Sequence, residues 1–285
     1  MMDAVQLATF HAVIGEGSFD AAARALHVTP SAVSQRIKAL EQAVGQVLVR
    51  RTKPAEPTAA GQALVRLAGQ VALLEREALD AARGALGGGG RTRIAVVVNA
   101  DSLHTWFLPA LAALPADPAL SFDLHQDDQD HTADLLRAGT AMAAVTAQHT
   151  AVQGCRVERL GAMRYLAVAA PGVFDGFATT PMIVLNRKDR LQHRFLASVT
   201  RRHLDPPLHY VPAAAAFVDA IRLGLGWGMV PEQLARPDLA SGRLAELTPG
   251  RHLDVPLYWQ YWRLESTILT TLTAAVRAAA EKVLR

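Results

Sequence analysis

The stretch from Phe19 to Val44 constrains the fold of this chain most, because it places two amphipathic helices around a tight break. A first short helix is expected over Phe19–Leu26, where apolar residues recur at helical spacing. Thr29 then offers its hydroxyl as an N-cap, and Pro30 occupies the first turn, where a missing N–H costs least. The apolar stripe of the second helix consists of Val33, Ile37, Leu40 and Val44. Two such helices at a sharp angle predict a helix-turn-helix.

The opposite face of the second helix is polar. Its hydroxyl, amide and ammonium groups can hydrogen-bond to base edges and phosphates in a major groove. Alanine-rich helix pairs are also common as plain packing, so a structural hairpin is the alternative interpretation. The side chains that we assign to DNA reading on this face are Ser31, Ser34, Gln35 and Lys38.

A basic turn follows the second helix. Gly45 is expected to end that helix, and residues 47–49 predict a short strand. Three cations come next, Arg50, Arg51 and Lys53. A strand that turns through a basic tip beside a helix-turn-helix predicts a wing, whose cations contact phosphates or enter the minor groove. The alternative is a solvated cluster of charges.

A long helix without proline is expected from Thr58 to Ala85. Its apolar stripe spans about 40 Å at 1.5 Å per residue and needs a cover. A small winged domain cannot cover that length, so we expect a helix from a second copy, which also suits paired DNA half-sites. The alternative is packing against its own domain. The residues assigned to dimerisation are Leu64, Leu67, Val71, Leu74 and Ala78.

Four consecutive glycines at 87–90 interrupt the chain, and no helix or strand is expected to persist through them. We therefore predict a winged helix-turn-helix domain at 1–58, a linker and dimerisation helix at 59–86, and a glycine hinge at 87–91. The remainder, 92–285, forms a second domain. With 51% hydrophobic residues, the chain has enough apolar side chains for the cores of two domains.

From Arg93 onward, predicted strands and helices alternate, which is typical of an α/β domain. We expect a mostly parallel sheet with helices on both faces and enough chain for two lobes, so the whole molecule is an α+β multi-domain protein. Strands are expected near 94–98, 120–124, 142–146, 165–169, 182–185, 227–230 and 257–262, and helices near 101–114, 132–136, 214–223 and 266–284.

Several classes of function are disfavoured by composition. The formal net charge is only +3, so the patterned helix face, and not charge, carries the argument for DNA. The single cysteine, Cys155, allows neither a disulfide framework nor a thiolate zinc cluster. No histidine pair has a metal-binding spacing and no nucleophile elbow occurs, so we expect no metal, no cofactor and no enzymatic activity. Without a signal sequence or a long apolar run, we expect a cytoplasmic protein that does not contact a membrane.

These segments resemble the LysR-type transcriptional regulators over the whole chain. The resemblance rests on AAARALHVTPSAVSQRIKALEQAVGQVLVRR, on the long linker helix and on GLGWGMVP at 224–231. Within the family, the chain is most similar to the branch that controls export and metabolism of lysine and arginine. That similarity is carried by VTPSAVSQRIKALE, RTKPAEPTAAG, VNADSLHTWFLPAL and GCRVERLGAMRYLAVA.

The resemblance adds two residues to the DNA-facing set, Thr29 and Pro30, and places Lys53 at the wing tip. Most of the family has Gln where this chain has Pro30, a proline that this branch shares. The Gln base contact of other members is therefore not transferred to this chain.

The resemblance also implies that residues 92–285 form an effector domain of two lobes, similar to periplasmic binding proteins, with a small molecule in the cleft. The first lobe would comprise 92–161 with 264–285, and the second 162–263. Near the start of a helix, Ser102 would favour an α-carboxylate of the ligand. The alternative is that Ser102 only caps the helix. The further candidate contacts are Asn99, Trp106, Thr146, Phe217, and Asp127 or Asp128 for a cationic side chain; plain core is the alternative for Phe217, and ordinary loop acids for the two aspartates.

We therefore expect a ligand-responsive DNA-binding regulator that senses lysine or arginine and controls a basic amino acid exporter or a related metabolism gene. Its expected partners are double-stranded promoter DNA, the amino acid effector, a second copy in a homodimer that assembles further into a homotetramer, and RNA polymerase if it is an activator. The alternatives are an architectural or replication-control DNA-binding protein and a LysR-type regulator of another small molecule. A different class, an enzyme or binding protein built on the second domain, is disfavoured by the missing catalytic groups and signal sequence.

Overall fold

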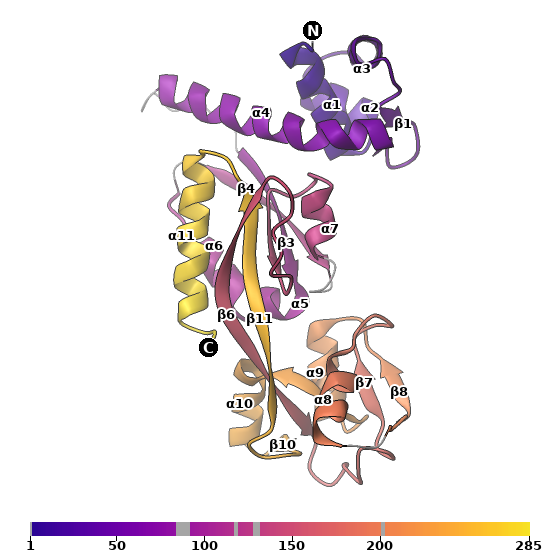
Figure 1. Ribbon diagram of the computed structural model, residues 1–285, viewed down its shortest axis with the longest axis vertical. Helices are drawn as coiled ribbons and strands as arrows, with labels where there is room; N and C mark the ends of the chain where they lie inside the picture. Colours follow the sequence, from indigo (N-terminus) through magenta and orange to yellow (C-terminus); the bar gives the residue numbers. More distant parts are fainter. Residues whose placement is uncertain (1, 84–91, 117–118, 128–131, 201–202) are drawn as a thin grey trace.

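The computed structural model describes residues 2–83, 92–116, 119–127, 132–200 and 203–285. Figure 1 shows a helical head, a long helix that crosses above the second domain, and two lobes joined by a pair of long strands. Within the described residues, none of the helices combines the length and apolar character of a membrane span.

The head contains the predicted helix-turn-helix. It consists of α1 (Ala4–Glu16), α2 (Phe19–Ala25), α3 (Pro30–Val44), β1 (Val49–Arg50) and β2 (Glu56–Pro57). The Thr29 hydroxyl accepts a hydrogen bond from the Ala32 N–H at 3.2 Å, and Gly45 ends α3 with a φ of 76°. Val33, Ile37 and Leu40 of the α3 stripe are buried together with the inner face of α1, so the head has its own core, whereas Val44, the last residue of the predicted stripe, is exposed.

The strand of the wing begins later than the sequence indicates. We predicted residues 47–49, but Val47 is exposed and β1 starts at Val49. The Glu41 carboxylate accepts hydrogen bonds from the N–H groups of Leu48, at 2.9 Å, and Val49, at 3.4 Å. This side chain therefore bonds the start of the segment to α3.

The long helix, α4 (Ala59–Arg83), links the head to the second domain. The Thr58 hydroxyl accepts from the Gly61 N–H at 3.1 Å and caps its first turn. Val65 and Ala68 join the core of the head, whereas Leu73 joins the core of the second domain. One helix is thus packed against both parts of its own chain.

The second domain is built on one mixed sheet. Its strands are β3 (Thr92–Asn99), β4 (Leu120–Asp127), β5 (Ala143–Thr146), β6 (Cys155–Ala169), β7 (Met182–Val184), β8 (Leu208–Tyr210), β9 (Trp227–Pro231), β10 (Ala245–Glu246) and β11 (His252–Trp262). Their order is β4-β3-β5-β11-β6-β9-β7-β8, with β10 also paired to β6.

The prediction of a mostly parallel sheet is wrong. Among the described strands, only the groups β4-β3-β5 and β9-β7-β8 are parallel, one in each lobe. Between them, β11 runs antiparallel to both β5 and β6, and β6 runs antiparallel to β9. The cause is that β6 leads from the first lobe to the second, and β11 returns beside it (Figure 1).

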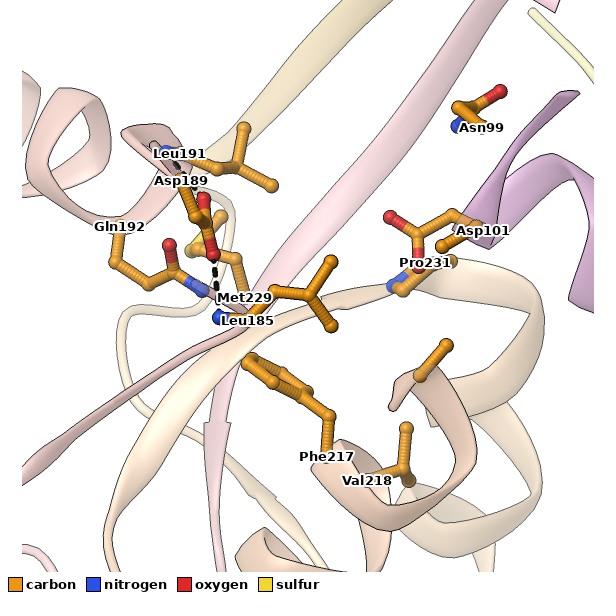
Figure 2. A pocket seen from close by; sticks show the side chains of 12 residues that line it. Asn99, Asp101, Leu185, Asp189, Leu191, Gln192, Phe217, Val218, Met229 and Pro231 are labelled. Atoms are coloured by element: carbon orange, nitrogen blue, oxygen red, sulfur yellow. Dashed lines mark hydrogen bonds between the residues drawn. The ribbon is translucent and has the colours of Figure 1, made fainter. Parts of the chain in front are cut away.

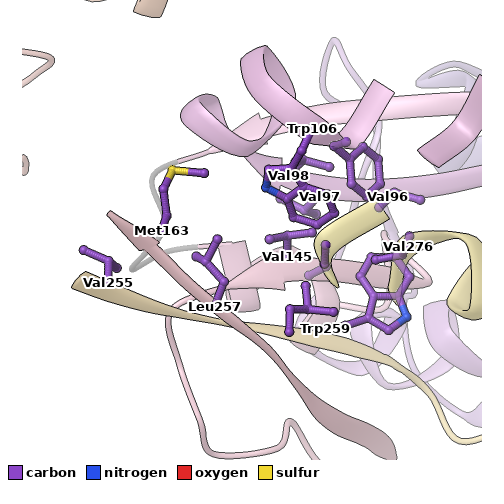
Figure 3. Close-up of a cluster of buried hydrophobic side chains, with 14 of the residues drawn as sticks. Val96, Val97, Val98, Trp106, Val145, Met163, Val255, Leu257, Trp259 and Val276 are labelled. Carbon is purple, nitrogen blue, oxygen red and sulfur yellow. The ribbon is translucent and has the colours of Figure 1, made fainter. Parts of the chain in front are cut away.

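The helices are divided between the two lobes (Figure 1). The first lobe holds α5 (Ala100–Ser102), the π-helical turn η2 (Leu103–Phe107), α6 (Leu108–Ala112), α7 (Thr132–Arg137) and α11 (Thr267–Glu281). The second holds α8 (Leu191–Val199), α9 (Ala214–Arg222) and α10 (Glu232–Ala240). The sequence did not predict α8 or α10. Figure 3 shows side chains of β3, β5, β6, β11 and α11 meeting in the larger core.

Candidate functional site

The polar face of α3 is available to a ligand outside the head. The side chains of Ser31, Gln35 and Lys38 are exposed, and that of Ser34 is half-buried. Thr29 and Pro30, at the first turn, are exposed as well. The local reason is the buried stripe on the other side of α3, which fixes the rotation of the helix. The structure therefore presents these side chains together on one outward surface.

The wing of the head lies between β1 and β2. Its cations Arg50, Arg51 and Lys53 are all exposed. The Arg51 guanidinium lies over the ring of Phe19, 4.6 Å from the centroid, so this cation packs against the start of α2. The Ala55 N–H donates to the Gly17 carbonyl at 2.7 Å and ties the wing to the head.

The predicted dimerisation stripe of α4 divides into two parts. Leu64 and Val71 pack against the core of the head, as in the alternative of packing within its own domain. Leu67 and Leu74 remain 38% and 39% exposed, and Ala78 is exposed too. The uncovered part of the stripe therefore lies on one face, away from both cores of this chain.

Polar contacts fix α4 to the first lobe. The Arg66 guanidinium donates to the carbonyl oxygens of Leu136, at 3.2 Å, and Arg137, at 3.1 Å, at the end of α7, and also to that of Gln153. Further along, the Glu77 carboxylate accepts from the Ser266 hydroxyl at 2.7 Å. A movement within the first lobe would thus act directly on this helix.

A second bridge joins the head to the sheet. The Arg93 guanidinium lies 2.6 Å from the Asp123 carboxylate and 3.6 Å from Glu16 of α1. Burial by itself would raise the pKa of Asp123, but the hydrogen bond and charge of Arg93, together with His125, lower it on balance. The pKa of His11 is lowered by burial and by the charge of Arg93.

A pocket lies where the two lobes meet (Figure 2). It opens beside the first turn of α5 on one side, and the loop before α8 and the helix α9 form the other. The residues that line it are Asn99, Ala100, Asp101, Leu185, Asp189, Leu191, Gln192, Ala214, Phe217, Val218, Met229 and Pro231. Two of these side chains are carboxylates, whereas none of the described lining residues is a lysine or arginine.

The carboxylates are held by neighbouring groups. Asp101 accepts a hydrogen bond from the Tyr165 hydroxyl at 2.6 Å. The two oxygens of Asp189 accept from the N–H groups of Leu185, at 2.9 Å, and Leu191, at 3.0 Å. These bonds orient both acids from opposite lobes toward the pocket.

Two neutral amide side chains also line the pocket. Asn99 and Gln192 are almost completely buried, and the Asn99 Oδ1 and Gln192 Oε1 atoms have no hydrogen-bond partner within the described structure. A buried acceptor without a donor costs about 1–3 kcal/mol. The pocket is therefore suited to a ligand that is rich in N–H donors and positively charged.

The predicted effector contacts have mixed outcomes. Asn99 and Phe217 line the pocket, and Phe217 also belongs to the core of the second lobe. Ser102 is fully buried in α5, does not line the pocket, and its hydroxyl has no partner among the described residues. The helix begins at Ala100, one residue earlier than predicted, and its N-cap is Asn99, so Ser102 lies inside it.

The structure places the other candidates elsewhere. Trp106 packs in the large core and borders an apolar groove between α6 and α11, because the π-helical turn redirects this face of the helix. Thr146 is buried at the end of β5, where its hydroxyl accepts from the Gln148 N–H at 3.1 Å. The backbone of Asp127 pairs with that of Asn99, and Asp128 lies outside the described residues.

Sequence reasoning missed Asp101, Asp189 and Gln192. For Asp101 a signal existed, since it precedes Ser102 directly after a predicted strand. For Asp189 and Gln192 there was none, because the helix that they introduce was not predicted. Asp189 and Gln192 lie near the first lobe because the paired strands β6 and β11 connect the two lobes.

Comparison with known proteins identifies both parts of the chain. Residues 5–62 match the family described as "Bacterial regulatory helix-turn-helix protein, lysR family", and residues 87–283 match "LysR substrate binding domain". The transcriptional regulator LysG of Mycobacterium tuberculosis is 52% identical over 100% of this chain and 95% of its own length. The lysine export transcriptional regulatory protein LysG of Corynebacterium efficiens is 44% identical, with all of both chains covered.

One solved structure carries a bound effector. The full-length LysG of Corynebacterium glutamicum with bound effector Arg is 41% identical, covers 100% of both chains and superposes with a TM-score of 0.79. The likeness therefore extends over the head, the long helix and both lobes.

Proposed function

This chain belongs to the LysR family of bacterial transcriptional regulators, and from that premise we propose that it senses a basic amino acid, lysine or arginine. The predicted family and fold class are confirmed, and the protein is a DNA-binding regulator and not an enzyme. The observation that carries the proposal is the pocket between the lobes, with its two carboxylates, its buried unpaired acceptors and no basic lining residue. A relative with arginine bound supports the same class of effector.

In this proposal the ligand joins the two lobes. The α-carboxylate lies against the N–H groups of the first helical turn at Ala100, where Asn99 provides no side-chain cap. Asp101 receives the α-ammonium group from the first lobe. Asp189 and Gln192 receive the side-chain cation from the second lobe. Such a ligand has a higher affinity for one arrangement of the lobes, and only that difference can shift the equilibrium.

Calorimetric titration tests this effector assignment. We expect heat of binding with lysine and arginine, and none with a neutral amino acid of similar length or with an aromatic acid. The reason is that only the basic amino acids supply the cation and the N–H donors that the pocket lacks. Tight binding of the aromatic acid, with none of the basic amino acids, would contradict the effector while leaving the regulator unaffected. Binding to a promoter fragment with and without each ligand links the site to DNA.

We also propose a cytoplasmic homodimer that contacts DNA through its two heads and assembles further into a homotetramer. If the protein is an activator, it also contacts RNA polymerase. The exposed part of the α4 stripe supports the dimer, because Leu67 and Leu74 need a cover that this chain does not supply. The DNA-facing residues proposed are Thr29, Pro30, Ser31, Ser34, Gln35 and Lys38 of the α3 segment and Arg50, Arg51 and Lys53 of the wing.

The dimer is tested by the double substitution Leu67→Asp and Leu74→Asp. Charges buried without partners in a helix seam are costly, so light scattering should show a mass below that of the parent assembly. The matched control is Leu79→Asp, an exposed leucine of the same helix about a third of a turn away from Leu67 and Leu74. An unchanged mass in the double variant would remove the seam.

A further inference from the structure

We propose that residues 283–285, which follow α11 and its C-cap Lys282, form a strap that joins the two lobes beside their hinge and restrains their relative movement. The strap runs from the first lobe, which carries α11, to α10 of the second lobe (Figure 1). Its role in setting the response to an effector rests on the proposed function, whereas the restraint itself does not.

The hinge is visible in the pairing of β6 with β11. Leu257 pairs with Gly161, but Tyr258 pairs with Arg159, so Leu160 is an additional residue in β6 and forms a bulge. On one side of the bulge, β11 pairs with β5 of the first lobe, and on the other, β6 pairs with β9 of the second. The regular ladder is therefore interrupted where the chain passes from one lobe to the other.

The strap binds at this interruption. The Ala162 N–H donates to the Arg285 carbonyl at 2.7 Å, and the Arg285 N–H donates to the Ala162 carbonyl at 3.0 Å. Gly161 has a φ of 136°, and a Cβ there would lie 2.8 Å from the Leu284 Cβ and 3.0 Å from the Arg285 carbonyl oxygen. Glycine thus leaves the space in which the strap crosses the strand.

Side chains complete the bridge to the second lobe. The Glu232 carboxylate, at the start of α10, accepts from the Nη2 atom of Arg285 at 2.8 Å and from its Nε atom at 3.2 Å. The Gln233 amide donates to the Val283 carbonyl at 3.0 Å. Glu232 is only 16% exposed, and although burial would raise its pKa, hydrogen bonds from Arg285 and Arg236 lower it on balance.

These contacts have a mechanical consequence. A rotation of one lobe against the other moves α10 relative to α11, so it must stretch the bonds of the strap. An effector that draws the lobes together would have to offset the loss of these bonds. Its affinity for the closed arrangement, relative to the open one, is the only free energy available for that. The strap would therefore weaken effector binding and keep the lobes in the present arrangement without it.

The substitution Arg285→Ala removes the ion pair that crosses between the lobes. The matched control is Arg236→Ala, because Arg236 contacts the same carboxylate at 2.9 Å from within α10. In the full-length chain with Cys155→Ser, spin labels at Ala112→Cys in the first lobe and Arg251→Cys in the second measure the interlobe distance. Without any ligand, we expect a broader distance distribution for Arg285→Ala and no change for Arg236→Ala.

Identical distributions for the two variants would overturn the strap. Gln233→Ala removes the second contact of the strap and should also broaden the distance distribution. Because it leaves Arg285 intact, it tests the strap even if Arg285→Ala fails to fold. In titrations with arginine, Arg285→Ala should bind about two- to fivefold more tightly than the parent chain, the range that one partly exposed ion pair supports. If arginine binds to no variant and not to the parent, the proposed effector fails, and the spin-label distances still decide the strap.

Discussion

The proposed DNA-reading face and the interlobe pocket both present polar groups, but they hold them in opposite ways. On the head, hydroxyl, amide and ammonium groups lie exposed along one side of α3. In the pocket, the acceptors of Asn99 and Gln192 are buried and unpaired, and the neighbouring acids come from segments far apart in the sequence.

This difference distinguishes a surface suited to reading DNA from a site suited to responding to a ligand. Exposed groups are hydrated in the free protein, so DNA replaces water bonds and no change of fold is needed. Buried acceptors without donors are costly until a ligand satisfies them. The two walls of the pocket belong to different lobes. A ligand that bonds to acceptors on both walls therefore favours one arrangement of the lobes. The first site can therefore bind continuously, while the second can change the state of the molecule.

The largest expected effect comes from the pocket. Asp101→Asn keeps the shape of the side chain and its bond to the Tyr165 hydroxyl, but removes the charge that faces the ligand. We expect the affinity for lysine and arginine to fall by about 3 kcal/mol, on the order of a hundredfold, because a charge left without its counter-charge in a buried site costs about 2–5 kcal/mol. Calorimetry measures the loss.

Asp175→Asn is the control for this loss, since it makes the same change of charge at an exposed position of the second lobe. Its affinity for the basic amino acids should equal that of the parent chain. DNA binding without ligand should be the same in both variants. Equal losses in the two variants would show that net charge, and not the pocket, attracts the ligand.

An intermediate effect is expected on the head. Ser34→Ala and Gln35→Ala should each weaken operator binding by about 1–3 kcal/mol and relax the preference at one base pair. Gln42→Ala is the control, because this exposed amide lies two turns further along α3, away from the end that enters a major groove. Band-shift titrations with single-base operator variants measure both effects. Unchanged affinity and preference in the first two variants would contradict the groove assignment.

The same contrast explains what the sequence could predict. In the head, each feature depends on neighbours in the chain: the buried stripe of α3, the Thr29 cap and the Gly45 stop lie within one segment. In the pocket, Asp189 is held by backbone N–H groups of its own loop but meets the first lobe only because β6 and β11 cross between the lobes. No local pattern reports such a crossing.

The structure differs from the sequence-based expectations at three places, each for a local reason. The helix after β3 begins at Ala100, so Ser102 lies inside it and not at its cap. The π-helical turn then changes which residues share a face, and Trp106 enters the core. Periodicity of 3.6 residues cannot reveal a wider turn. The antiparallel pairing of β6 with β11 was likewise hidden, because alternation of strands and helices suggests parallel neighbours.

The smallest expected effect is on the wing, and it tests whether Lys53 contributes to DNA binding through its charge alone. Lys53 is exposed, so Lys53→Ala should weaken DNA binding by less than about 1 kcal/mol near 0.2 M salt and equally for all sequences. Its signature is the salt dependence: the slope of log affinity against log salt should fall by about 1, because one fewer counterion is released. Lys188→Ala, an exposed lysine of the second lobe, should leave the slope unchanged. A loss confined to one operator sequence, at constant slope, would instead assign Lys53 to base reading and would make the wing resemble α3.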